Sequence, residues 1–103
     1  MAHAYQLVIE FEGDDLENCD RVIALEESLS EALSRDLVDG HDVGQGIANI
    51  FVHTDQPLRC FEEAMRVIDS AEPSPSSAAY RRFEDEDYVR VWPKDDPTRF
   101  TLR

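Results

Sequence analysis

The sequence predicts an α+β fold in which two helices cover one face of an antiparallel sheet. Three observations support this class: segments with alternating apolar and polar residues, segments with apolar residues every three or four positions, and their order, β-α-β-β-α-β-β. With 103 residues and 42% hydrophobic content, the chain is suited to one hydrophobic core. We therefore expect a single domain over residues 1–93 and a C-terminal tail over residues 94–103.

The first element is a strand over residues 5–12. Leu7, Ile9 and Phe11 lie on one side of this segment, and mainly polar residues alternate with them. A period of two with aromatic and β-branched residues indicates a strand with one buried face. Val8 lies on the other face, which we expect to be partly apolar and available for homodimerisation through the sheet.

The second element is a helix from Leu16 to about Ser34. Its apolar residues are spaced by three and four positions, which places them on one helical face. The predicted core residues are Val22, Leu25, Leu29 and Leu33, flanked by Ile23 and Ala32.

A hairpin follows the first helix. Residues 37–43 and 47–53 are strand-like and flank a short segment rich in glycine, a residue that tolerates positive φ. We expect a two-residue turn at Gly44 and Gln45.

The second helix begins at Pro57, where the missing N–H of proline does no harm. It ends by residues 71–73. Its predicted apolar stripe consists of Leu58, Phe61, Met65 and Ile68.

A second hairpin completes the order, with strands at residues 79–83 and 88–92 and an acidic turn between them. Two βα units around a central hairpin, with both helices on one sheet face, predict a ferredoxin-like two-layer sandwich with one added strand.

The charge of the chain limits its partners. Asp and Glu number 23 against 10 Lys and Arg, a net charge of −13. Nucleic acids and anionic membranes are polyanions, so we expect neither as a partner. The excess lies in residues 1–53, which carry 12 acids and two arginines, net −10.

This polarity predicts two partner-binding regions. An acidic helix face would meet a basic protein, and a basic island on the last hairpin would meet an acidic ligand or the acidic half of a second copy. A solvated helix face and ordinary cross-strand pairing explain the same residues without a partner. The candidates are Glu26, Glu27 and Glu31 in the helix and Arg81, Arg82 and Arg90 in the hairpin.

A candidate ligand site involves Gly13, His41 and Asp42, because imidazole and carboxylate bind metals and polar ligands. The predicted turn places His41 opposite Ala48, and His53 then lies about 16 Å away along the strand, too far to share an ion. A hairpin with a solvated histidine is the alternative. We expect no metal and no cofactor.

Catalytic chemistry has little support in the sequence. Cys60 stands beside Arg59 near the start of the second helix, an arrangement that can lower the pKa of a thiol. Cys60 also lies close to Ala64 on one side of the predicted helix, where a cysteine usually packs as a small apolar residue. No serine lies in a nucleophile elbow, and we assign no catalytic residue.

The cytoplasm is the expected location. No apolar run approaches the roughly 20 residues that span a bilayer, and the first residues lack the pattern of a signal peptide. Cys19 and Cys60 both fall in predicted helices and are expected to be reduced.

A further pattern is formed by residues 39–44, 49–51, 54–55, Pro57, Tyr80 and 87–93, and it covers about the last two thirds of the chain. In these residues the chain resembles a small bacterial family of uncharacterised ferredoxin-like proteins. This resemblance implies a bacterial cytoplasmic protein and transfers no activity or catalytic residue.

Three hypotheses for function remain open. The first is a non-catalytic protein–protein interaction or regulatory module, such as an immunity-type inhibitor of a basic toxin, that is also a homodimer. The second is an ACT-like sensor of a small molecule bound near Gly13 and the hairpin at residues 40–46. The third is a thiol or metal enzyme that uses Cys60 or His41.

Overall fold

The computed structural model describes residues 4–12, 16–33, 36–44, 46–69, 75–85 and 87–92, and for residues 16–19 and 69 it describes the backbone only. The predicted tail at residues 94–103 and the candidate ligand residue Gly13 lie outside the described residues.

The seven predicted elements are all present in the predicted order. They are β1 (Tyr5–Glu12), α1 (Leu16–Ala32), β2 (Leu37–Gly44), β3 (Ile47–Thr54), α2 (Pro57–Asp69), β4 (Ser77–Arg82) and β5 (Val89–Trp92). In the last hairpin, β4 begins at Ser77 instead of Ala79, and β5 begins at Val89 instead of Tyr88.

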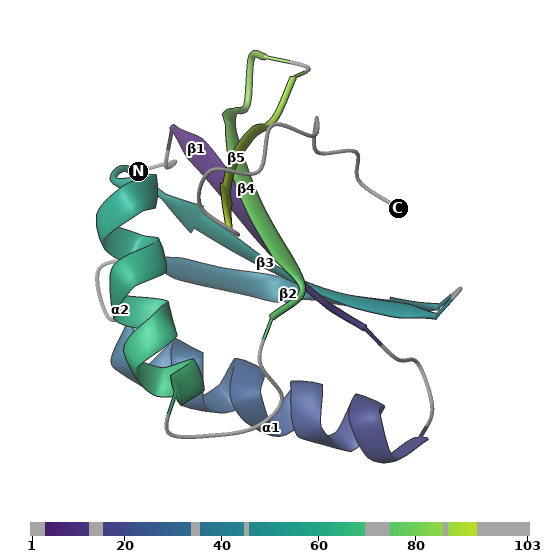
Figure 1. The fold of residues 1–103 in the computed structure, drawn as a ribbon. Coiled ribbons are helices and arrows are strands. Elements are labelled where there is room, and N and C mark those ends of the chain that lie inside the picture. Colours follow the sequence, from purple (N-terminus) through teal and green to yellow (C-terminus); the bar gives the residue numbers. More distant parts are fainter. Residues whose placement is uncertain are drawn as a thin grey trace.

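The five strands form one antiparallel sheet in the order β2-β3-β1-β4-β5. Both helices lie on the same face of this sheet, as Figure 1 shows, with α1 next to β2 and β3 and α2 next to β1. A two-layer α+β sandwich is therefore confirmed.

The core lies between the helices and the sheet. Leu7 of β1 is paired with Val52 of β3, and Ile9 is paired with Ile50, so alternate residues of neighbouring strands present one apolar surface. The helices contribute eight buried residues to the same cluster: Val22, Leu25, Leu29 and Leu33 from α1, and Cys60, Phe61, Ala64 and Ile68 from α2.

Three apolar positions predicted on or beside the helix stripes are not part of the core. Leu58 of α2 is 58% exposed, Ile23 of α1 is 40% exposed, and Ala32 of α1 is also exposed. The buried face of α2 is centred on Cys60 and Ala64, both fully buried, because small side chains allow the helix to approach the sheet. Leu58 consequently lies outside the buried face.

The register of the first hairpin differs from the prediction. Gly44 is paired with Ile47, so the turn lies between them, and His41 is opposite Ile50 instead of Ala48. Gly46 has a φ of +82°, which a glycine adopts without strain.

An irregularity near the start of β2 shifts the register a second time. Val38 is paired with Val52 and Gly40 with Phe51, so Asp39 is the extra residue of a β-bulge, and Gly40 has a φ of +143°.

The sheet face without helices is not an open apolar surface. Val8 and Ala79 are fully buried in a small cluster with Phe51 and Tyr88. The neighbouring positions are polar, and Glu10 is only 3% exposed. Val8, which the sequence places on a face available for homodimerisation, is therefore buried within the chain.

Candidate interaction surfaces

The first candidate surface is acidic and is formed by α1 and β2. The buried stripe of α1 leaves Glu27 and Glu31 exposed, and Glu26 lies at its border toward β2. In β2, Asp39 and Asp42 are both exposed. We call these five residues, Glu26, Glu27, Glu31, Asp39 and Asp42, the acidic surface. The three glutamates lie on the helix side of β2, and the two aspartates lie on the opposite side.

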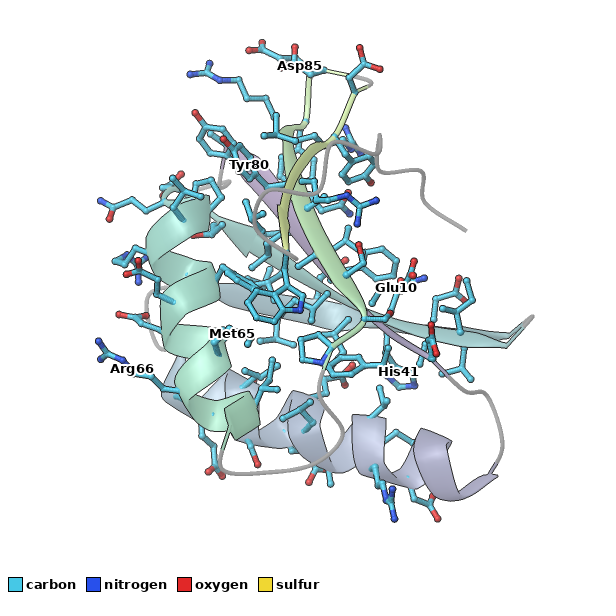
Figure 2. The ribbon with its side chains drawn as sticks, in the orientation of Figure 1. Glu10, His41, Met65, Arg66, Tyr80 and Asp85 are labelled. Atoms are coloured by element: carbon cyan, nitrogen blue, oxygen red, sulfur yellow. The ribbon has the colours of Figure 1, made fainter. Side chains whose placement is uncertain are left out.

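His41 connects the two elements of this surface. Its Nδ1 lies 2.7 Å from Glu26 Oε2, and both side chains are partly exposed. Because His41 is paired with the buried Ile50, its side chain lies on the helix face of the sheet, and Figure 2 shows it directed toward α1. The contact brings Glu26 next to β2.

His53 lies on the opposite face and makes a separate contact. Its Nε2 is 3.4 Å from Asp39 Oδ2, and its ring packs edge-on against Phe83 with centroids 4.8 Å apart. The two histidines are therefore on different faces of the sheet. In the described residues, no group of three or more His, Cys, Asp or Glu side chains is placed to hold a metal ion.

The residues of the predicted ligand site are not brought together. His41 and Asp42 are consecutive in β2, so their side chains point to opposite faces of the sheet. His41 contacts Glu26, and Asp42 is exposed on the other side.

The β2 strand also forms an edge of the sheet. It is the first strand in the order and pairs only with β3 among the described strands, so its other side presents backbone N–H and C=O groups without a partner strand. Leu37, at its start, is 52% exposed. This edge is long, with eight residues, whereas β5 at the other edge has four.

The predicted basic island is engaged in internal contacts. Arg81 Nη1 donates to three backbone carbonyls of the β4–β5 turn, those of Arg82, Phe83 and Asp85, over 3.0 to 3.3 Å. The Arg81 guanidinium also lies over the rings of Phe83 and Tyr88. Arg81 therefore stabilises the turn, whose tip carries Asp85 (Figure 2).

The other two arginines point in different directions. Arg90 Nη1 donates to Ser77 Oγ over 2.6 Å. Arg82 lies over the ring of Tyr5 and contacts Glu84 at 3.4 Å; these contacts with Tyr5 and Glu84 raise the pKa of Arg82. The three side chains do not form one continuous basic patch.

A second candidate surface is an apolar groove between α2 and β5. It has a volume of about 760 Å³ and is lined by Leu58, Phe61, Glu62, Met65, Arg66, Val91 and Trp92. Two helices, each about 10 Å wide, cover about four strands spaced 4.8 Å apart. Because β5 is a fifth strand, the groove lies where the helix layer ends.

A buried polar cluster joins the beginnings of β2 and α2. Asp36, whose side chain is 1% exposed, accepts hydrogen bonds at Oδ1 from Thr54 Oγ1 over 2.6 Å and from Arg59 Nη2 over 3.1 Å. Arg59 also donates to Glu63 over 2.7 Å. Although burial opposes it, the neighbouring carboxylates raise the pKa of Arg59 above its usual value.

Cys60 adjoins this cluster and is not an activated thiol. It is fully buried. Burial and then the neighbouring Asp36 carboxylate raise its pKa to about 12, and these effects outweigh Thr54 and Arg59, which lower it. A thiolate is the nucleophilic form, so the geometry opposes a catalytic role for Cys60. The side chain of Cys19 lies outside the described residues.

The sequence interpretation missed the groove. Leu58 and Met65, which the apolar spacing predicts to face the core, line this groove together with Trp92, although Met65 also packs against the core. The groove could have been predicted from the number of elements, because two helices cannot cover all five strands of the sheet and therefore leave one sheet edge uncovered.

Comparison of the chain with protein-family models, with curated proteins and with solved structures finds no match. Neither α1 nor α2, the helices of the described chain, combines the length and apolar character needed to cross a membrane.

Proposed function

We propose that the protein is a non-catalytic interaction module that binds a basic protein partner through the acidic surface. The observation that carries this proposal is that acidic side chains flank the β2 edge on both faces of the sheet. Glu26 contacts His41 at 2.7 Å on the helix face, and Asp42 is exposed on the opposite face. Among the described residues of α1 and β2, Arg21 is the only Arg or Lys.

Electrostatics explains how such a surface acts. At physiological ionic strength, charges attract over about 8 Å, and complementary charge accelerates association and selects among partners. The net charge of −13 extends the same preference to the whole chain. A basic protein is therefore the partner class that the surface favours.

Charge reversal tests this proposal. The surface variant carries Glu27→Lys, Glu31→Lys and Asp42→Lys, three exposed positions outside the Glu26–His41 and Asp39–His53 contacts. The control variant carries Glu62→Lys, Glu84→Lys and Asp85→Lys, three exposed acids on α2 and the β4–β5 turn. Both variants raise the net charge by the same amount.

The readout is chemical cross-linking of each purified chain to proteins in a lysate of the source cells, followed by mass spectrometry. We expect the mass spectra to identify basic proteins that cross-link to the wild type and to the control variant but not to the surface variant. Their capture should fall as salt rises, because screening weakens exposed charges. Equal capture by both variants would show that the acidic surface is not the binding site.

The finer fold assignment is also a proposal. The order β2-β3-β1-β4, with all neighbours antiparallel and both helices on one face, supports a ferredoxin-like sandwich to which β5 is added at the edge. Relationship to the small bacterial family and a cytoplasmic location stay predictions.

Homodimerisation through the sheet face stays a prediction with reduced support. Val8 and Ala79 are already buried within the chain. Among the described residues of that face, Phe51 is the partly exposed apolar side chain of β3.

A second candidate function is the binding of a small apolar molecule. The groove between α2 and β5 favours it, because its volume falls in the usual range for ligand sites and its lining includes Phe61, Met65 and Trp92. Quenching of Trp92 fluorescence during a ligand screen tests this function, with Leu58→Glu as the variant that should prevent binding.

A further inference from the structure

We infer that the outer edge of β2 accepts an extended basic segment of the partner as an additional strand. This inference rests on the proposed function and specifies its binding mode. Addition of a strand uses backbone hydrogen bonds for affinity and alternate side chains for specificity. The observation behind it is the eight-residue edge, which pairs on one side only among the described strands.

The regular part of the edge is long enough for this mode. After the bulge at Asp39, residues 40–44 pair with β3 without interruption. Five residues extend over about 17 Å, which is a common strand length. A Cβ at Gly40 or Gly44 would meet nothing within 4 Å, so side chains of an added strand would not be crowded there.

The side chains beside this edge determine the pattern of the added strand. On the face without helices, Asp42 is the charged residue between Gly40 and Gly44, and Asp39 lies at the bulge. On the helix face, Val43 packs against the core beside His41. A segment in which Lys or Arg alternates with β-branched residues therefore complements both faces.

Charge also disfavours a second copy of β2 as the strand added to this edge. A second copy of β2 added to this edge would bring its own Asp39 and Asp42 close to those of the first copy. Like charges on neighbouring strands are destabilising, and charged side chains at an edge are a common means of preventing such pairing. A basic partner removes this penalty.

Three synthetic peptides of about ten residues test the inference against the ¹⁵N-labelled chain at about 50 mM salt. The first alternates Lys and Thr, which favours a strand. The second alternates Lys and Pro, which has the same charge but fewer backbone donors and cannot complete a ladder. The third alternates Glu and Thr and controls for charge.

We expect the Lys–Thr peptide to bind at least about tenfold more tightly than the Lys–Pro peptide. It should also shift the amide resonances of residues 40–44 and slow the hydrogen exchange of the outward-facing amides. The Glu–Thr peptide should not bind, and the surface variant should lose both effects.

Two results would overturn the inference, and they have different consequences for the proposed function. If both basic peptides bind equally and the surface variant binds neither, charge alone guides binding, and only the edge mode is wrong. If neither basic peptide binds the wild-type chain, both the edge mode and the basic-partner proposal lose their basis.

Discussion

Arg59, in the first turn of α2, donates through Nη2 to the buried Oδ1 of Asp36 at the start of β2, over 3.1 Å. The two residues are 23 positions apart, so the contact connects the two βα units of the fold. Thr54 at the end of β3 donates to the same oxygen, which places three elements around one carboxylate.

Asp36→Ala should therefore destabilise the chain by about 2–4 kcal/mol, because it leaves buried donors without an acceptor. Urea unfolding followed by circular dichroism measures this change. Glu63→Gln removes the more exposed partner of Arg59 and should cost less than about 1 kcal/mol. Equal losses for the two variants would contradict the role assigned to Asp36.

The Cys60 thiol should resist alkylation in the folded chain. Its burial and raised pKa of about 12 keep it protonated and inaccessible at neutral pH. Site-resolved mass spectrometry after iodoacetamide treatment separates Cys60 from Cys19. We expect Cys60 to react only after unfolding in urea, and rapid reaction in the native chain would contradict the burial.

The same pKa shift predicts a dependence of stability on alkaline pH. In the folded chain, the pKa of the Cys60 thiol is raised from its ordinary value of 9.0 to about 12. Its contribution to the free energy of unfolding is therefore fully present below pH 9 and is lost as pH rises toward about 12. Over that window, the free energy of unfolding should fall less in Cys60→Ala than in the wild type. If the free energy of unfolding fell equally with pH in both proteins, Cys60 would not contribute to the pH dependence of stability.

The two apolar positions at the start of α2 should respond differently to substitution. Leu58→Glu should leave stability within about 0.5 kcal/mol of wild type, because its side chain is 58% exposed. Phe61→Ala should cost about 3 kcal/mol, because it removes a buried ring that contacts Trp92 with centroids 6.2 Å apart. Thermal unfolding of both variants checks the prediction, and a larger loss for Leu58→Glu would contradict the packing of α2.

Arg81 should be required for order in the β4–β5 turn. Arg81→Lys keeps the charge but not the planar fork that reaches the carbonyls of Arg82, Phe83 and Asp85. We expect faster hydrogen exchange in the described turn and a stability loss of about 1 kcal/mol. Arg82→Lys, at a more exposed position, is the matched control and should leave exchange in the turn unchanged.

Local patterns predicted the secondary structure because each element has a clear period. The alternation of Leu7, Ile9 and Phe11 and the stripe from Val22 to Leu33 match the buried faces of β1 and α1. In α2, the predicted core positions of Phe61, Ile68 and Cys60 are confirmed, whereas Leu58 is exposed. Apolar spacing alone does not show where the buried face of a helix ends.

The candidate sites depended on register, which local patterns do not determine. The turn between Gly44 and Ile47 sets the register of His41, and the packing of α1 on the sheet brings Glu26 beside it, although the sequence assigns the two residues to different sites. Likewise, the contacts of Arg81 with turn carbonyls follow from the path of the backbone after β4. Spacing along the chain predicted the residue types but not these partners.

Binding of a basic segment to the acidic surface is measured most directly by the Kd of a fluorescent Lys–Thr peptide for the surface variant and for the control variant, by anisotropy at about 50 mM salt. We expect wild-type affinity for the control variant and binding at least about tenfold weaker, or about 1.4 kcal/mol, for the surface variant. Equal affinities of the two variants would contradict it, because general charge, and not the acids of α1 and β2, would then govern binding.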